Sequence, residues 1–406
     1  MLFTHTERIR EALKGEKKMK DTTISQAVRY VGADDKTIDL FEGQYVVPNG
    51  ISYNSYVILD EKIAVMDTVD KRASDEWMEN VEKVLDGKQP DYLVVTHLEP
   101  DHAANIQALA EKYPEMTVVA SAKAVSMLPQ FFTLDFSHRC QAVKEGDTLS
   151  LGSHTLHFVM APMVHWPEVM VVYESSEKIL FSADGFGKFG ALDAEEDWTC
   201  EARRYFINIV GKYGMQVQAL LKKAASLDIQ TICPLHGPIL KENLGFYLNK
   251  YDIWSSYRPE DEGVLVAYAS IHGNTAQAAK EMAEILKVKG VEKIEVMDLA
   301  RDDMSEAVEN AFRYSRMVVA APSYDAWVLP CMDTFLRKLK AKNYQNRRVA
   351  VMENGSWAPS AGRCMKELLG EMKNVTVCEP MVTIRSTVKP ETVTAMEQLA
   401  DVLLEK

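Results

Sequence analysis

The sequence predicts an α/β protein in two parts, a mixed α/β region with hairpins followed by a doubly wound parallel sheet. The first observation is the length of 406 residues, which suits two or three domains at about 100–200 residues each. The second is a charged segment with Pro and Gly at residues 258–263, typical of an exposed linker, after which the pattern changes. We therefore expect one domain over residues 1–258 and a second over residues 259–406.

The second part alternates apolar runs with helical patterns. Helix-like stretches separate the runs, the first opening at Asn274, and Pro330 suits the first position of a later helix. Strands that alternate with helices predict βαβ units in a parallel sheet with helices on both faces. The five strand-like runs are residues 264–270, 294–299, 317–322, 349–352 and 375–384.

The first part has many short apolar runs in succession, with helices only at intervals. The expected helices cover residues 74–85 and 103–112, which is too few for simple alternation with the strands. Met19 follows a Lys-rich run whose codons can form a ribosome-binding sequence, so we expect residues 1–18 to be a non-essential extension. The expected strands cover residues 56–59, 63–66, 92–95, 117–119, 155–159, 169–173 and 178–181.

Composition excludes several classes of protein. With 46 basic and 59 acidic residues, the net charge of −13 argues against binding nucleic acid or an anionic membrane. No apolar stretch approaches the roughly 20 residues of a membrane span, and the polar, basic start does not resemble a secretory signal. The six cysteines are scattered without a CxxC pair, which excludes a zinc ribbon or rubredoxin-type site on this chain. We expect a cytoplasmic protein.

The sharpest local pattern is a cluster of ligand-type side chains directly after the apolar run at 92–95. A lone His-x-Glu is usually a solvated turn, but the strand end, the density of ligands and the apolar surroundings favour a metal site here. Strand alternation would send the first three side chains in one direction, and we expect the fourth to open the following helix. The cluster consists of His97, Glu99, Asp101 and His102.

Three further residues stand at strand-to-loop exits, where α/β folds gather their active sites. His165 follows the run at 155–159, Asp184 follows 178–181, and His236 follows an apolar run at 229–233. With the first cluster they make seven nitrogen and oxygen donors without a thiolate, enough for two metal ions that share a bridge. We expect the remaining histidines of this part to be structural or solvent-exposed: His5, His138, His154 and His157.

The second part carries a candidate anion pocket at the end of its first strand. Small hydroxyl residues and glycine between a strand and a helix aim backbone N–H groups and the helix dipole at a phosphate. The third and fourth strands end in loops with aromatic residues, at the sheet edge where α/β folds bind ligands. The candidate residues are Ser270, His272, Gly273, Asn274 and Thr275 in the first loop, Pro322, Ser323, Tyr324, Asp325, Ala326 and Trp327 in the second, and Asn354, Gly355, Ser356 and Trp357 in the third.

The metal pattern resembles the metallo-β-lactamase fold, whose zinc hydrolases carry a His-x-His-x-Asp-His motif. Glu99 stands here where those enzymes place the second histidine, which resembles the signature of flavodiiron proteins (A-type flavoproteins). Added carboxylates make a harder site that suits iron better than zinc. The resemblance implies an αββα domain with two irons. One would be held by His97, Glu99 and His165, the other by Asp101, His102 and His236, and Asp184 would bridge them.

The second part resembles flavodoxin along its whole length, which implies that the three loops bind FMN. The family reduces dioxygen to water, nitric oxide to nitrous oxide, or both, with electrons relayed through FMN. Rubredoxin is its commonest external donor, and the resemblance implies a head-to-tail homodimer or a dimer of dimers. Tyr205 is a candidate hydrogen-bond donor in the oxygen pocket, although a helix-surface position is at least as compatible with its surroundings.

Three alternatives stay open at this point. A zinc-dependent hydrolase with an accessory flavodoxin-like module would not explain why Glu99 stands in place of a histidine. A flavin oxidoreductase that uses NAD(P)H directly would need a second nucleotide fingerprint, which we do not find. A redox or nitric oxide sensor would keep the cofactors, but no signalling segment accompanies them. We favour the reductase, and the pattern does not decide between dioxygen and nitric oxide.

Overall fold

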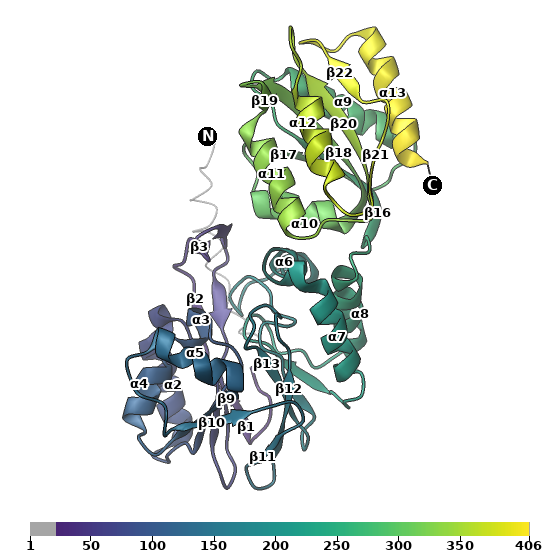
Figure 1. The fold of residues 1–406 in the computed structure, drawn as a ribbon. Helices are drawn as coiled ribbons and strands as arrows, with labels where there is room; N and C mark the ends of the chain where they lie inside the picture. Colours follow the sequence, from purple (N-terminus) through teal and green to yellow (C-terminus); the bar gives the residue numbers. More distant parts are fainter. Residues whose placement is uncertain (1–21, 406) are drawn as a thin grey trace, which may run out of the picture.

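Three large sheets organise residues 22–405, which the computed structural model describes (Figure 1). Two of them lie in residues 28–233 and the third in residues 261–384. The expected extension at residues 1–18, and His5 within it, fall outside the described part. No helix in the described residues is both long and apolar enough to cross a bilayer.

The first two sheets are built from short strands. The six-stranded sheet has the order β1-β6-β7-β8-β9-β10, and the five-stranded sheet has the order β11-β12-β13-β14-β15. Their strands are β1 (Val28–Tyr30), β6 (Tyr56–Ile58), β7 (Ala64–Met66), β8 (Tyr92–Val95), β9 (Thr117–Ser121), β10 (Cys140–Val143), β11 (Thr148–Ser150), β12 (Thr155–Met160), β13 (Met170–Glu174), β14 (Ile179–Phe181) and β15 (Thr231–Cys233). Two small hairpin-like pairs, β2 (Ala33–Asp35) with β5 (Ile51–Tyr53) and β3 (Leu40–Phe41) with β4 (Tyr45–Val46), complete this part.

The two sheets pack face to face because their strands alternate between two apolar faces. In β8, Val94 joins a core shared with Phe158 and Val172 of the other sheet. Its neighbours Leu93 and Val95 face the opposite way, into a core shared with the helices. Successive side chains of a strand point to opposite faces, so a strand that is buried on both faces is apolar at every position.

Helices cover both outer faces and complete the predicted αββα layers. On α2, Trp77, Val81 and Leu85 recur every four residues and are fully buried. The helix expected at 103–112 is two helices, because Pro100 opens one at its first position and the second begins at Ile106. These helical segments are η1 (Lys71–Ala73), α2 (Ser74–Leu85), α3 (Pro100–Ala103), α4 (Ile106–Lys112), α5 (Ala122–Phe131), α6 (Trp198–Tyr205), the π-helical turn η2 (Phe206–Val210), η3 (Gly211–Tyr213), α7 (Gly214–Ala224) and α8 (Leu244–Ser255).

The third sheet confirms the doubly wound prediction. Its main strands run parallel in the order β17-β16-β18-β20-β21, the 2-1-3-4-5 order of flavodoxin. The expected fifth strand is two short strands, β21 and β22, which both pair with β20. The strands are β16 (Asp261–Tyr268), β17 (Ile294–Asp298), β18 (Tyr314–Tyr324), β19 (Trp327–Val328), β20 (Arg347–Asn354), β21 (Val375–Val377) and β22 (Val382–Ile384), and the helices are α9 (Asn274–Val288), α10 (Met304–Arg313), α11 (Pro330–Ala341), α12 (Ala361–Gly370) and α13 (Pro390–Leu404).

Arg258 and Glu262 of the expected linker are exposed, but Glu260 between them is part of a buried ion network. The Arg203 guanidinium on α6 donates to Glu260 (Nε to Oε2, 2.7 Å) and also to Glu309 of α10. Lys250 and Trp254 of α8 donate to the same Glu260 carboxylate, whose side chain is 5% exposed. A buried carboxylate needs such partners, so the charge that suggested solvent exposure is used to join α6, α8 and α10.

Replacing Arg203 should loosen this junction. In Arg203→Met, Glu260 and Glu309 keep their burial but lose their shared cation, which should cost about 3 kcal/mol in free energy of unfolding. Urea unfolding followed by circular dichroism would measure the loss. The matched control is Arg337→Met, which removes a solvent-screened pair with Asp333 and should leave the free energy of unfolding nearly unchanged. Equal losses in the two variants would contradict this account.

A second charged cluster connects the turn after β6 of the first sheet with two turns of the second sheet. The His154 ring lies between two carboxylates, with Nδ1 2.7 Å from Asp60 Oδ2 and Nε2 3.2 Å from Glu177 Oε1. Burial opposes protonation, but these hydrogen bonds and the nearby Glu174 outweigh it and raise the pKa of His154. His154 is therefore structural, as the sequence suggested.

The cluster predicts a pH-dependent stability. Because the folded pKa of His154 is raised, its charged contacts stabilise fully below the unfolded pKa of about 6.5 and are lost as the pH rises through the folded value. His154→Gln should thus lose about 1–2 kcal/mol at pH 5.5 and less at pH 9. The matched control is His157→Gln, whose ring contacts the Ser175 hydroxyl. Urea midpoints for both variants would be measured across this pH range. A loss of stability in His154→Gln that does not change with pH would contradict the prediction.

Candidate functional site

Loops at strand ends bring the seven expected metal ligands together at one edge of the sandwich. The first four follow β8, on the loop and on α3, and the others follow β12, β14 and β15. All but one are buried, and the exception, Glu99, is partly buried. The seven residues form two groups, His97, Glu99, His165 and Asp184 in the first and Asp101, His102 and His236 in the second.

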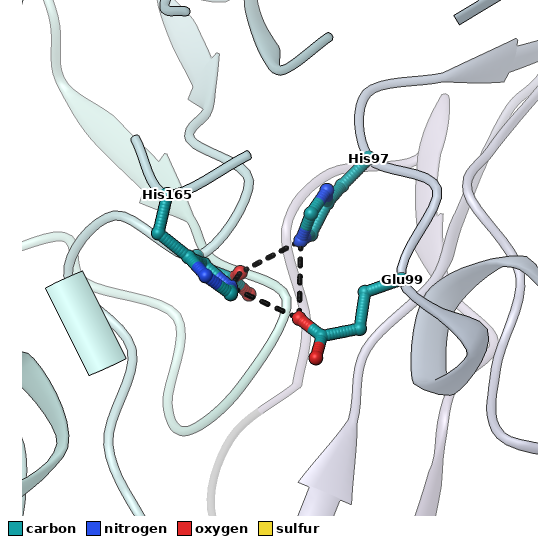
Figure 2. Close-up of side chains that lie close together, drawn as sticks. His97, Glu99 and His165 are labelled. Carbon is teal, nitrogen blue, oxygen red and sulfur yellow. Dashed lines mark hydrogen bonds and ion pairs between the residues drawn. The ribbon is translucent and has the colours of Figure 1, made fainter. Parts of the chain in front are cut away.

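The first group surrounds a point between four side chains, three of which are labelled in Figure 2. Glu99 Oε2 lies 3.2 Å from His97 Nε2 and 2.9 Å from His165 Nε2. Asp184 Oδ2 lies 3.3 Å from the same nitrogen of His97 and 3.2 Å from that of His165. The imidazoles of His97 and His165, the Glu99 carboxylate and one oxygen of Asp184 therefore converge on one point.

The second group repeats this arrangement on the other side of Asp184. Asp101 Oδ2 lies 3.2 Å from Nε2 of both His102 and His236, and these two nitrogens are 3.0 Å apart. The remaining oxygen of Asp184, Oδ1, lies 3.3 Å from His102 Nε2. One carboxylate thus presents one oxygen to each group, which is the geometry of a bridge.

Spacing and unmet hydrogen-bonding capacity both fit a pair of metal ions. Donors about 2.1 Å from a metal lie roughly 3.0–3.4 Å from one another in octahedral or tetrahedral geometry, as these atoms do. Both carboxylate oxygens of Asp101 and of Asp184 are buried and accept no hydrogen bond from the described residues. Buried carboxylates that accept no hydrogen bond are costly, here offset only by ion-pair contacts with the imidazoles, and metal coordination would satisfy them.

Electrostatics at the site favour charged ligands. Burial opposes ionisation of Asp184, but the surrounding imidazoles outweigh it and hold its pKa well below its usual range. Burial would likewise lower the pKa of His165, yet Asp184 and Glu99 raise it to about 9. The pKa of Glu99 is lowered by His165 and His97 despite its burial. Without metal, the imidazoles share protons with the carboxylates, and a metal ion would replace those protons.

Contacts behind the ligands orient the imidazole rings. Glu168 Oε1 accepts from His97 Nδ1 at 2.8 Å and from the backbone N–H of Leu98 at 2.9 Å. His236 Nδ1 donates to the backbone oxygen of Ser52 at 2.7 Å. Each bond leaves Nε2 as the free donor atom toward the metal position. The sequence reasoning missed Glu168, whose signal is a carboxylate three residues beyond a candidate ligand.

Aromatic rings close the metal site on the protein side. The Trp166 ring lies edge-on to His97 with centroids 5.3 Å apart, and Phe41 lies edge-on to His236 at 5.4 Å. Tyr205, at the end of α6, is 1% exposed, with its ring 5.5 Å from that of His236. It is therefore not a helix-surface residue, and burial together with Asp184 and Asp101 raises its pKa well above the usual value.

A second site, a cleft, opens at the carboxyl edge of the third sheet with a volume of about 600 Å³. Gly273, with φ of 94°, precedes the first turn of α9 in a conformation that L side chains rarely adopt. The exposed N-terminus of this 15-residue helix suits a phosphate. At the mouth, Tyr324 and Trp357 are 47% and 91% exposed, as suits aromatic rings that stack on a planar ligand.

Most of the expected cleft residues line this space, and two do not. Gly273 shapes the turn without lining the cleft, and the indole of Trp327 donates to Asp333 of α11 at 2.9 Å instead. The sequence reasoning missed Ser386, whose backbone bonds twice to the Asn354 side chain and brings the end of β22 to the cleft. Residues that line the cleft in addition to the expected ones are Ile271, Ala358, Ser360 and Ser386.

Comparison with known proteins agrees with this geometry. The family model described as ODP family beta lactamase matches residues 51–237. An uncharacterised protein of Methanocaldococcus jannaschii is 30% identical over 375 residues, which span 91% of this chain and 94% of the relative. A nitric oxide reductase of Moorella thermoacetica is 28% identical over 373 residues, which span 89% of this chain and 92% of that protein.

Solved structures match over nearly the whole chain. The rubredoxin oxygen:oxidoreductase of Desulfovibrio gigas aligns with a TM-score of 0.88 and 27% identity, covering 94% of this chain and 97% of its own. A flavo-diiron protein variant of Thermotoga maritima aligns with a TM-score of 0.84 and 26% identity, covering 93% and 95% respectively. The chain belongs to the flavodiiron proteins, with a β-lactamase-like part and a flavodoxin-like part.

Glu168 offers a test of the metal site that leaves every ligand in place. In Glu168→Gln the hydrogen bond to His97 loses its negative charge, which should weaken metal binding by about 10- to 100-fold. Competition with a coloured chelator would measure the affinity. Glu195→Gln makes the same change in charge at an exposed position and should leave the affinity unchanged. Unaltered binding in Glu168→Gln would show that the bond does not support the ligand.

Proposed function

We propose that this protein reduces dioxygen to water, nitric oxide to nitrous oxide, or both, at a diiron centre, with electrons relayed through FMN from an external donor. The observation that carries the proposal is Asp184, which presents one oxygen to each ligand group. Two adjacent metal ions with a common carboxylate suit reactions that deliver several electrons to one small substrate.

Iron is the metal that the donor set favours. Each group holds two imidazoles and one carboxylate of its own, the set that non-haem iron sites use, besides its share of Asp184. Glu99 adds negative charge where a zinc hydrolase would carry a histidine. The alternative function, a zinc-dependent hydrolase with an accessory flavodoxin-like module, lacks a role for this carboxylate and for the cleft.

When bound, the irons and FMN supply electrons to the diatomic substrate, and the side chains fix geometry and protons. Glu168 and the Ser52 carbonyl hold His97 and His236 with Nε2 directed inward. We assign Tyr205 as the hydrogen-bond donor to substrate, because its raised pKa keeps the hydroxyl protonated beside Asp184. Trp166 and Phe41 exclude water from the ligand rings.

The separation of the two sites within one chain supports a dimer. β16 begins at the junction beside Glu260, and its eight residues span about 26 Å. The loops that line the cleft follow the carboxyl ends of β16, β18 and β20. This end of the third sheet lies away from the two sheets that hold the metal ligands (Figure 1). We propose a head-to-tail homodimer, or a dimer of such dimers, in which the flavin of one copy meets the irons of the other.

Donor and substrates are assigned from the relatives. The Desulfovibrio gigas structure bears the name rubredoxin oxygen:oxidoreductase, and the Moorella thermoacetica relative is named a nitric oxide reductase. We propose rubredoxin or another reduced carrier as the donor, and both gases as substrates. All six cysteines are free thiols, which suits a reducing compartment, and we propose the cytoplasm.

Turnover of the loaded protein tests this function. Protein loaded with iron and FMN and then reduced should consume dioxygen without releasing peroxide, or nitric oxide with formation of nitrous oxide. Asp184→Asn removes the bridging negative charge and replaces one of its two oxygens with an NH2 group that does not coordinate metal. This variant should lower the rate at least about 100-fold and the iron content below two per chain. Asp135→Asn, an exposed position, should match the wild type in both.

The hydrolase alternative has a distinct signature in the same experiment. Protein that consumes neither gas, and that retains zinc and no flavin when purified, would overturn the reductase assignment. Gel filtration of the loaded protein at several concentrations would test the dimer.

A further inference from the structure

A small apolar cavity lies directly behind the metal-binding loops and has no part in the chemistry described so far. It is enclosed by β12, β13 and β14 on one side and by α7 and α8 on the other. Its volume is about 20 Å³, which is room for one small molecule. We infer that this cavity is a docking site for the diatomic gas on its way to the metal centre, an inference that rests on the proposed function.

The walls of the cavity keep water out. They expose only apolar surface, supplied mainly by aliphatic side chains. The two hydroxyls nearby are already engaged, since Ser182 donates to the backbone oxygen of Gly185 at 2.6 Å and Tyr251 accepts from the N–H of Phe186. A buried water needs two to four polar partners, so a cavity of this kind stays dry and accepts apolar atoms.

The position of the cavity links it to the ligands. Its inner wall includes Val164, which precedes His165, and Gly185, which follows Asp184. Both residues are buried. One residue of backbone therefore separates the apolar space from two ligands of the first metal group.

Burial falls from the inner wall to the opposite end. Phe186 and Val164 are 5% and 3% exposed, whereas Leu220, Ala224 and Val159 at the other end are only partly buried. The cavity thus lies between the partly buried face of α7 and the buried metal-binding loops. A polar or charged solute would lose its hydration there without compensation, and dioxygen, nitric oxide or xenon would lose almost none.

Xenon provides a direct probe, because it is apolar and similar in size to the gases. Crystals of the full chain loaded with iron and FMN, pressurised with xenon, should show one atom between α7 and Phe186. Ala224→Phe places a ring in the space and should abolish that peak. The same variant should raise the KM for the gas several-fold with kcat and iron content unchanged, since only access is altered.

The matched control is Ala219→Phe, a substitution on the exposed face of the same helix, which should keep both the xenon atom and the KM. Leu220→Phe, at the partly buried end of the cavity, provides a second filling variant if Ala224→Phe does not fold. No xenon in the wild type, or a filled cavity with an unchanged KM, would overturn the inference. Consumption of neither gas by the wild type would instead overturn the proposed function, while the xenon peak would still report whether the cavity takes an apolar guest.

Discussion

The arrangement of the metal centre depends on one carboxylate, that of Asp184. Its two oxygens point to different ligand groups, so its position fixes how far apart two metal ions would lie. The side chain is 1% exposed and accepts no hydrogen bond from the described residues. An ionised group in that environment is unfavourable on its own, and the imidazoles of His97, His102 and His165 supply the opposing charge. The strand end after β14 therefore holds a residue whose burial makes sense only when cations surround it.

The sandwich supplies the rigidity that this carboxylate needs. Ligands come from four separate strand ends, and each strand is fixed on both faces by alternate apolar side chains such as Val94 and Leu93. Hydrogen bonds from Glu168 and Ser52 then fix individual rings. Metal binding in turn would coordinate the oxygens of Asp101 and Asp184, which accept no hydrogen bond. The fold and the metal centre would therefore stabilise each other. The apolar cavity behind the same loops shows that tight packing is relaxed at one place beside the ligands.

The sequence predicted the candidate site correctly where the functional residues directly follow the ends of strands. Runs of apolar residues locate β8, β14 and β15, and the His, Asp and Glu residues that follow them meet because these strands end at one edge. It failed where partners are distant in sequence. Glu260 stands in a segment with the composition of a linker. Only the fold reveals that its carboxylate is buried and pairs with Arg203, 57 residues earlier in the chain. Ser386 gave no signal, because the segment after Ile384 carries neither the glycine nor the aromatic residues that mark the other strand ends of the cleft. A partner near in sequence also changed one expectation, since the Trp327 indole donates to Asp333, six residues further on, and Trp327 is not among the residues that line the cleft.

The junction between the two parts bears on function as well as on stability. Arg203 joins α6 to Glu260 and to α10, and its neighbour Arg204 donates to Ser305 of α10 at 3.0 Å. α6 also carries Tyr205, whose ring lies beside His236. The helix that closes the metal site is thus the same helix that holds the flavodoxin-like part in place. Because that part is held with its cleft at the far end of β16, a rotation that brought the two sites of one chain together would break a buried ion network. A second copy could bring its own cleft to the metal site without breaking this network, which is why we propose a dimer and not a hinge motion.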